Sequence, residues 1–368
     1  MLNEYKISEI PAGNCRVWGR TTSSRSPLTL FWTGSGLELN VQGGELWVEV
    51  ETSYSILEQW AALLINGALI SRHMLEKGRH WICLFRGMDP DRPKNVRFLK
   101  EVQAMPNDPE ARMQIHALKV DGQLLPVSRL PYKLEFIGDS ITSGEGLIGA
   151  RGEEDWIPMF FSSAYGYPML TAEACGAEYR TVSQSGWGVL SSWDNNPYNV
   201  LPRVYTQICG PLEGEANGAL GAYEENDFAA WQPDVVVVNL GTNDGGALNQ
   251  PPWQDPATGE SFRQARDAKG RESFQNAAVN FLKLLRAKNP GAYLLWAYGM
   301  LGREMAASIR EAVARYQVET GDRRAAFLLL PDTTEETFGS RQHSGKAAHA
   351  QAAAVLSDSI QSILHLEG

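Results

Sequence analysis

Short stretches that alternate apolar and polar residues fill the first 130 residues of the chain. They are rich in β-branched and aromatic residues, are separated by turn-forming residues, and cover positions 15–20, 28–34, 44–53, 62–71, 79–87 and 113–122. The fourth stretch contains Asn66-Gly67, the dipeptide that most strongly predicts a tight β-hairpin. No long helical pattern separates these stretches. We therefore expect an all-β sandwich domain over residues 1–130.

From about Tyr132 the pattern changes to apolar runs that alternate with amphipathic stretches. The expected strands are residues 133–137, 179–183, 234–240, 293–298 and 325–330, and the expected helices are residues 167–177, 273–289, 303–321 and 344–364. The four valines at 235–238 are typical of a parallel strand covered on both faces. The pattern predicts a three-layer α/β/α domain over residues 131–368, with ligands bound at the carboxyl ends of the strands.

Composition and charge narrow the classes of function. The chain has 43 Asp and Glu against 33 Lys and Arg, a net charge of −10, which argues against nucleic acid and anionic membranes as partners. The four cysteines (Cys15, Cys83, Cys175 and Cys209) form no CxxC pair, so we interpret them as reduced thiols with no zinc site. No apolar run approaches the ~18 residues of a membrane span, and no signal-peptide pattern is seen. We expect a cytoplasmic protein.

Four groups of polar residues fall where predicted strands end. Ser140 lies in "GDSIT" after the first strand of the α/β domain, and Gly186 lies in "SGWG" after the second. Asn243 lies in "GTND" after the third strand, and His343 lies in "SRQHSGKAAH" after the last strand. Because the carboxyl ends of parallel strands meet at one edge of a sheet, we expect these four residues to form one site.

The residue types at this edge indicate acyl transfer. A serine hydroxyl needs a base to remove its proton, and His343 is the best placed candidate. The backbone N–H groups of Ser140 and Gly186 and the side-chain amide of Asn243 could hold an oxyanion. Taken singly, these residues would pass for a helix cap, a turn glycine in competition with Gly188, and an Asx turn. Their occurrence in order favours a serine esterase.

The four blocks resemble those of the SGNH (GDSL-type) hydrolases, over roughly residues 132–366. With a β-rich domain in front, the chain resembles the two-domain acetyl-xylan esterases of carbohydrate esterase family 2. This resemblance implies a jelly-roll-like sandwich followed by a flavodoxin-like SGNH domain, and removal of O-acetyl groups from xylan and related sugars. It implies no cofactor, and an acetylated carbohydrate or another small acyl ester as the partner.

Two positions beside His343 depart from the family pattern. Ser340 and Ser344 stand where the family commonly has Asp and Pro. The acid that orients a catalytic histidine is therefore missing from its usual place. The acids that could replace it are Asp332, Glu335 and Glu336. A main-chain carbonyl could orient the ring instead, as in family 2 members thought to use a Ser–His dyad, and this is the interpretation that we favour.

Further residues could line the substrate pocket: Asp139, Trp187, Gly188 and Trp253. Asp139 and Asp244 could also brace their turns through backbone N–H groups, which is the role we expect. Trp187 could wall the pocket and leave room only for a small acyl group, or it could be a core residue. The loop residues Trp156, Trp193 and Trp253 could stack on sugar rings or anchor their loops.

His349 falls inside the last predicted helix, where packing or capping is the expected role. No carboxylate or cysteine cluster has the spacing of metal ligands, so we expect no metal site. Other functions stay open. They are hydrolysis of longer acyl chains by a lipase- or thioesterase-like enzyme, and carbohydrate binding with an inactive hydrolase domain. A phosphate or nucleotide binder is disfavoured because no P-loop or GxGxxG follows a strand. The sequence does not predict the sugar, the ester position or the oligomeric state.

Overall fold

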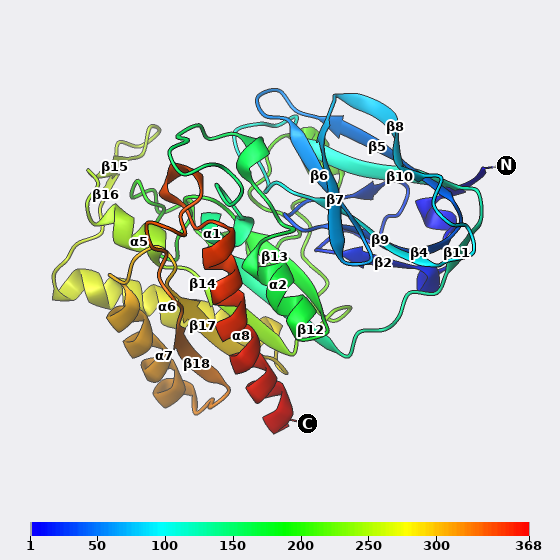
Figure 1. Ribbon diagram of the computed structural model, residues 1–368. Helices are drawn as coiled ribbons and strands as arrows, with labels where there is room; N and C mark the ends of the chain where they lie inside the picture. Colours follow the sequence, from blue (N-terminus) through cyan, green and yellow to red (C-terminus); the bar gives the residue numbers. More distant parts are fainter. Residues whose placement is uncertain (1, 368) are drawn as a thin grey trace. The chain divides into compact units, whose positions relative to one another are not determined.

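The computed structural model describes residues 2–367, which divide into two compact units (Figure 1). Unit 1 contains the chain up to Leu130 together with Ile157–Ala164 and Gln207–Asn226. Unit 2 contains Pro131–Trp156, Tyr165–Thr206 and the chain from Asp227 onward. Two short segments that follow Leu130 in the chain thus belong to unit 1.

Unit 1 is built from two antiparallel sheets. The first has the order β1 (Asn3–Lys6), β10 (Arg112–Val120), β5 (Glu45–Ser53) and β8 (Gly78–Arg86), with β3 (Leu28–Thr29) also paired to β10. The second has the order β11 (Gln123–Leu125), β4 (Gly36–Gln42), β9 (Lys94–Lys100), β6 (Gln59–Ile65) and β7 (Ala68–Leu75), with β2 (Cys15–Trp18) paired to β4. Two 3₁₀ turns, η1 (Ile7–Glu9) and η2 (Ala12–Asn14), precede β2.

Buried and partly exposed side chains alternate along the strands, as expected for sheets that cover a core with one face. In β5 the side chains of Leu46, Val48 and Val50 are buried in the core of unit 1, while the residues between them are partly exposed. Strands β6 and β7 form the predicted hairpin. Asn66 and Gly67 both have positive φ (51° and 81°), the conformation that a two-residue turn between strands requires.

Buried polar groups attach the two later segments to unit 1. The Glu101 carboxylate is fully buried and accepts hydrogen bonds from the backbone N–H groups of Ser163 (2.9 Å) and Ala164 (3.0 Å). Arg72 donates to Glu101 (2.5 Å) and, through Nη2, to the carbonyl of Phe161 (2.7 Å). These contacts hold the segment that contains η3 (Pro158–Phe160). The indole of Trp32 likewise donates to the carbonyl of Ile208, in the segment that contains α4 (Glu215–Ala219).

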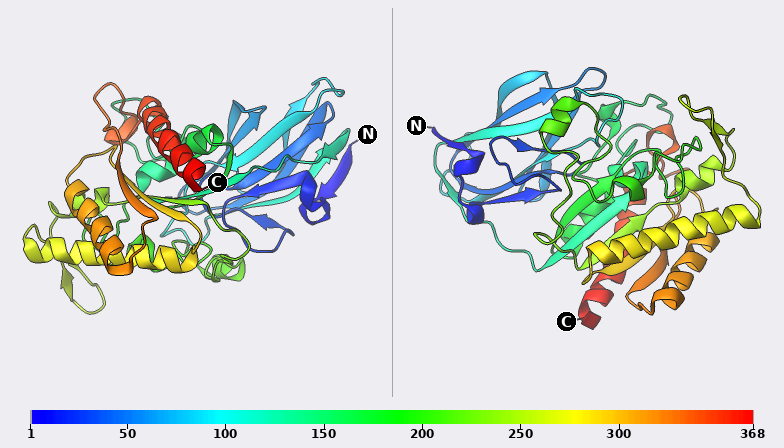
Figure 2. Two further views of the ribbon diagram at one scale, coloured as in Figure 1. Left: turned by 90° about the horizontal axis from the view of Figure 1, so that it is seen from below. Right: turned by 180° about the vertical axis from the view of Figure 1, so that it is seen from behind.

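Unit 2 is a three-layer α/β/α domain. Its parallel sheet has the order β13 (Ala177–Ser183), β12 (Tyr132–Gly138), β14 (Val235–Asn239), β17 (Tyr293–Tyr298) and β18 (Ala325–Leu329). Helices α2 (Tyr167–Ala174) and α8 (Lys346–Glu367) pack together, and so do α6 (Ala268–Lys288) and α7 (Ala306–Thr320). Figure 1 shows α2 and α8 in front of the sheet, and the view from behind in Figure 2 shows α6 in front of it. The predicted α/β architecture is confirmed.

Short elements at the carboxyl edge of this sheet were not predicted. They are α1 (Ser140–Ser143), α3 (Leu201–Val204), α5 (Thr242–Ala247), η4 (Ser340–Gln342) and the hairpin of β15 (Trp253–Gln254) and β16 (Ser261–Phe262). The strands β12 and β14 are neighbours, and the chain order of the strands reverses between them. Crevices at such a reversal are the usual ligand sites of open α/β sheets.

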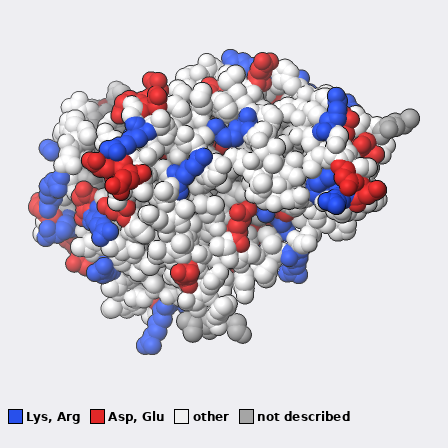
Figure 3. Space-filling model, in the orientation of Figure 1, with Lys and Arg blue, Asp and Glu red and all other residues white. Residues whose placement is uncertain are grey.

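The distribution of surface charge and the polarity of the helices agree with what the composition predicts. On the face drawn in Figure 3, basic and acidic side chains are interspersed among neutral ones, without an extended basic patch. Among the described residues, no helix combines the length and the apolar character that a membrane span needs.

Candidate active site

The turn after β12 presents Ser140. Strand β12 ends at Gly138, and α1 begins at Ser140 with Asp139 as its cap, whose Oδ1 accepts from the N–H of Ile141 (3.0 Å). A Cβ at position 138 would lie 1.9 Å from Oγ1 of Thr142. Only glycine therefore allows the strand to turn so sharply into the helix, and this turn sets the serine at the edge of the sheet.

Ser140 and His343 are in hydrogen-bonding distance. Nε2 of His343 lies 3.1 Å from Oγ of Ser140, and Nδ1 lies 3.0 Å from the main-chain carbonyl oxygen of Arg341. A carbonyl only accepts, so Nδ1 must carry the proton of the neutral ring. Nε2 is then left with a lone pair that can accept the serine proton.

The backbone before His343 is strained. Arg341 and Gln342 both have left-handed conformations, with φ of 53° and 55°. For residues other than glycine this conformation costs about 1–2 kcal/mol each. The loop is fixed by hydrogen bonds from the N–H of Ser340 to the carbonyl of Gly146 (2.9 Å) and from the N–H of His343 to the carbonyl of Ser340 (3.0 Å). The strained turn directs the Arg341 carbonyl at the imidazole.

The three candidate acids have other surroundings. Oδ1 of Asp332 accepts from the backbone N–H groups of Gly302 (3.0 Å) and Thr333 (3.2 Å). Glu335 pairs with Arg151 at the surface (3.1 Å), and Glu336 is exposed. Within residues 2–367, none of these three carboxylates pairs with the His343 ring, because each binds another segment or faces solvent. The geometry therefore supports a Ser–His dyad oriented by a carbonyl.

Two backbone N–H groups near Ser140 could bind an oxyanion. Gly186 follows β13 and has a φ of 79°, which glycine adopts without cost. Within residues 2–367, the N–H groups of Ser140 and Gly186 have no acceptor in the protein. They are therefore available to a negatively charged oxygen.

Asn243 is engaged more fully than the sequence suggests. It lies in the first turn of α5, and its Nδ2 donates to Oδ2 of Asp139 (3.1 Å) and to the main-chain carbonyl of Trp187 (3.0 Å). Both of its N–H groups are thus used inside the protein. The amide is fixed beside the nucleophile turn, and it could reach an oxyanion only by exchanging or sharing one of these contacts.

Asp139 and Asp244 both act on backbone N–H groups. Asp244 accepts from the N–H groups of Val189 (2.9 Å), Leu190 (2.8 Å) and Ser191 (3.3 Å), so it braces the loop after Gly186 more than its own turn. Burial raises the pKa of the Asp244 carboxyl. Burial also raises the pKa of Asp139 to about 7, with smaller contributions from the charges of Asp244 and Glu145.

Glu145 is a site residue that the sequence reasoning missed. Its carboxylate is buried, and Oε1 lies 3.5 Å from Nε2 of His343 and 3.5 Å from Nε of Arg341. The only sequence signal was a glutamate between two glycines, Gly144 and Gly146, directly after α1. At Gly146 a Cβ would lie 3.0 Å from Cβ of His343, which shows how closely this segment approaches the histidine loop.

Comparison with known proteins decides the family. Residues 136–351 match the model of the GDSL-like Lipase/Acylhydrolase family. The chain belongs to this family. The sequence-based resemblance to SGNH (GDSL-type) hydrolases is thereby confirmed.

The relatives of this GDSL-like hydrolase include carbohydrate esterases. The structure of an acetyl xylan esterase from the rumen bacterium Butyrivibrio proteoclasticus is 44% identical, with a TM-score of 0.97 over 99% of both chains. The Cellulase/esterase CelE of Acetivibrio thermocellus is 25% identical over 86% of this chain. An acetylxylan esterase / glucomannan deacetylase of Cellvibrio japonicus is 27% identical over 62% of this chain. The chain spans 35% and 61% of the length of these two curated relatives.

Aromatic residues of the GDSL-like domain differ in exposure. Trp187 is only 8% exposed, whereas Trp193 is 52% exposed. The indole Cδ1 of Trp193 lies 3.0 Å from the position that a Cβ on Gly186 would take. Trp193, more than Trp187, therefore flanks the candidate oxyanion glycine on its open side. Trp253 packs edge-on against the exposed Tyr198, with ring centroids 5.5 Å apart.

Gly188 and His349 have packing roles in the hydrolase domain. A Cβ on Gly188 would approach the carbonyl oxygen of Ser191 to 2.1 Å, so this position excludes larger residues for structural reasons. The ring of His349 is buried, accepts from the N–H of Tyr167 at Nδ1 (3.0 Å) and stacks on the Tyr167 ring. Burial lowers the pKa of His349 to about 3, so it is neutral at any pH at which the enzyme would work.

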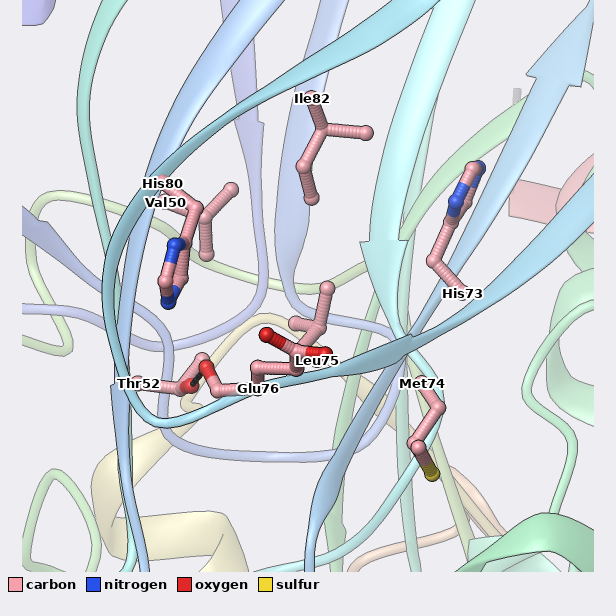
Figure 4. Close-up of a pocket in the computed structure, with 8 residues that line it drawn as sticks. All are labelled: Val50, Thr52, His73, Met74, Leu75, Glu76, His80 and Ile82. Atoms are coloured by element: carbon pink, nitrogen blue, oxygen red, sulfur yellow. Dashed lines mark hydrogen bonds between the residues drawn. The ribbon is translucent and has the colours of Figure 1, made fainter.

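A separate hollow lies in unit 1. It has a volume of about 270 Å³ and is lined by residues of β5, β7 and β8 and by Glu76 (Figure 4). His73 and His80 lie on opposite sides of it in the close-up. Nε2 of His73 contacts Oγ of Ser71, and Nε2 of His80 contacts the carbonyl of Lys77. The residues that line it include no serine or cysteine.

Proposed function

We propose that this protein is a serine esterase that removes small acyl groups, above all acetyl, from carbohydrates such as acetylated xylo-oligosaccharides. The observation that carries the proposal is the 3.1 Å contact between Nε2 of His343 and Oγ of Ser140, with Nδ1 held by the Arg341 carbonyl. A nucleophile, a base and an orienting acceptor in this arrangement are what acyl transfer through a serine requires.

Acylation begins when Ser140 attacks the ester carbonyl. Nε2 of His343 takes the hydroxyl proton as the new C–O bond forms, and the carbonyl oxygen becomes an oxyanion. When the tetrahedral intermediate collapses, the bond to the sugar oxygen breaks and the imidazolium gives its proton to that oxygen. The sugar hydroxyl leaves, and the acyl group stays on Ser140.

Deacylation repeats the cycle with water. Neutral His343 takes a proton from a water molecule, which attacks the acyl-enzyme. The second tetrahedral intermediate collapses to the carboxylic acid, and the proton on Nε2 returns to Oγ of Ser140. The Nδ1–H bond to the Arg341 carbonyl keeps the ring in the required tautomer throughout.

The backbone N–H groups of Ser140 and Gly186 are the proposed oxyanion donors. Loss of one such donor typically lowers kcat by about 10²–10³-fold. Asn243 is proposed as the third donor. Its Nδ2 donates to Asp139 and to the carbonyl of Trp187, so substrate binding must redirect or share one of these bonds.

Loop aromatic residues and the activities of related proteins support the proposed acyl group and substrate. The Trp193 indole beside Gly186 supports a limit on the size of the acyl group. Exposed aromatic faces at Trp193 and Tyr198 offer surfaces on which sugar rings can stack. The relative that is 44% identical is an acetyl xylan esterase, and a more distant one is also a glucomannan deacetylase. Xylan and glucomannan fragments are therefore the first substrates to test.

For its setting we propose the cytoplasm, where thiols remain reduced. All four cysteines are unpaired in the structure. Fractionation of the native host cell, with detection by antibody, tests this; recovery outside the cell membrane would contradict it.

A series of nitrophenyl esters tests the acyl specificity. We expect kcat/KM to be highest for acetate and to fall as the acyl chain lengthens to octanoate. A rise toward octanoate would favour a lipase- or thioesterase-like hydrolase. Labelling with a fluorophosphonate separates these two kinds of active hydrolase from a binding protein with an inactive domain, because an inert Ser140 would stay unlabelled. Acetate release from acetylated xylo-, manno- and gluco-oligosaccharides then identifies the sugar.

A further inference from the structure

A second charged group faces the base of the proposed dyad. The Glu145 carboxylate lies 3.5 Å from Nε2 of His343, on the same nitrogen that faces Ser140. Its side chain is 5% exposed, so water screens its charge poorly. The acids that we considered from the sequence lie elsewhere, and Glu145 is the carboxylate that the fold brings to the ring.

We propose that Glu145 is a positioning residue that stabilises the protonated form of His343 during the reaction. The Arg341 side chain partly balances the negative charge of Glu145. The inference rests on the proposed function, because it concerns the base of that reaction. When Nε2 takes the serine proton, the ring becomes a cation 3.5 Å from a buried anion. Attraction at this distance stabilises the charged ring as it forms in the reaction.

Arg341 contributes twice to this arrangement. Its main-chain carbonyl accepts the Nδ1 proton, and its Nε lies 3.5 Å from the same Glu145 oxygen that faces Nε2. The arginine therefore balances the carboxylate, which would otherwise place an unpaired negative charge beside the nucleophile. The left-handed backbone at Arg341 and Gln342 is what allows one residue to serve both nitrogens of the ring, directly at Nδ1 and through Glu145 at Nε2.

Other groups near the imidazole affect its charge less directly. His349 in α8 is buried and neutral, with a pKa lowered to about 3. Asp139, the cap of α1, has a pKa raised to about 7 by burial and titrates in the working range of the enzyme. A rate measurement alone would mix the titration of Asp139 with that of the base. The test must therefore follow His343 itself.

The alternative is that Glu145 only holds the loop around Arg341. Glu145→Gln separates the two roles, because glutamine keeps the shape and can still accept from Arg341 but has no charge. If the charge matters, we expect kcat/KM at pH 8 to fall about tenfold. The acid limb of the pH profile should move to lower pH by about one unit, because the imidazolium has lost its counter-charge.

Arg341→Gln is the opposing variant. It keeps the main-chain carbonyl that accepts from Nδ1 but removes the cation that balances Glu145. The imidazolium is then favoured more strongly, so the acid limb should move to higher pH. Glu272→Gln, an exposed glutamate in α6, is the matched control and should leave the profile unchanged.

The direct readout is the proton chemical shift of the His343 ring over pH 4 to 9, with the resonance identified by its absence from His343→Ala. The midpoint should move down in Glu145→Gln and up in Arg341→Gln. Coinciding midpoints in folded Glu145→Gln and wild type would overturn the inference while leaving the esterase proposal intact. A wild-type protein that neither releases acetate nor reacts with fluorophosphonate would instead overturn the proposed function. If Glu145→Gln fails to fold, the shift in Arg341→Gln decides alone.

Discussion

The main-chain carbonyl oxygen of Arg341 lies 3.0 Å from Nδ1 of His343. This contact does what an aspartate does in a Ser–His–Asp triad: it fixes the tautomer and the direction of the ring. A carbonyl brings no full charge, however, and cannot neutralise an imidazolium. The buried carboxylate of Glu145, 3.5 Å from Nε2, is the proposed source of that charge.

The proposed Ser140–His343 dyad predicts unequal effects of replacing Ser140, His343 and Asp332. Ser140→Ala and His343→Ala should each lower kcat by about 10⁴-fold or more, because each removes an essential partner in the proton transfer. Asp332→Asn should leave kcat/KM within about threefold, since its carboxylate binds the backbone of Gly302 and Thr333 and not the histidine. Steady-state kinetics on nitrophenyl acetate measure all three. A collapse of Asp332→Asn with an unchanged melting temperature would restore a triad.

Gly186→Ala should damage the oxyanion site. The residue has a φ of 79°, and the new Cβ would lie 3.0 Å from the Trp193 indole. Displacement of its N–H should lower kcat by about 10²–10³-fold. Gly259→Ala is the matched control, because Gly259 has a similar φ (75°) with no atom near the new Cβ. The prediction fails if both variants retain wild-type kcat.

Acid should destabilise the protein partly through His349. The folded state keeps this ring neutral down to a pH of about 3, whereas the unfolded chain binds a proton near pH 6.5. The unfolded state thus holds more protons between these values, and stability falls as the pH drops below 6.5. His349→Asn keeps an acceptor for the N–H of Tyr167 but cannot titrate. Its stability deficit relative to wild type should shrink by about 2 kcal/mol from pH 7 to pH 5. Urea unfolding at the two pH values measures the difference, and a constant deficit would contradict the assignment.

The segment Ile157–Ala164 should depend on Glu101. Glu101→Ala leaves Arg72 and the backbone donors of Ser163 and Ala164 buried without their acceptor. Breaking a buried pair in this way typically costs about 3–5 kcal/mol. Glu49→Ala, which removes a pair with Arg79 at the surface of the same unit, should cost far less. Chemical unfolding compares them, and equal losses would show that the Glu101 network adds little.

The sequence predicted the elements whose signal is long and repetitive. The α/β alternation from Tyr132 onward gave all five parallel strands, because apolar runs such as 235–238 are unambiguous when both faces are buried. In unit 1 the pattern missed β4 and β9, although both are long. Their signal is blurred by buried polar residues such as Glu38 and Lys94, whose partners come from distant strands or loops.

The site was predictable where a residue type carries its own chemistry. Ser140 and His343 were paired from the order of strands, and the structure places them 3.1 Å apart. Contacts made by the main chain or by chance proximity of loops were not predictable. The Arg341 carbonyl looks like any other in the sequence, and Glu145 reaches the ring only because Gly146 lets its segment pack against His343.

Acetate release from acetylated xylo-oligosaccharides by the wild type and by Ser140→Ala, measured side by side, tests the proposed activity most directly. We expect steady release by the wild type and none above background by the variant, with both proteins melting at the same temperature. Equal release by the two proteins, or none by either, would contradict a serine-dependent carbohydrate deacetylase.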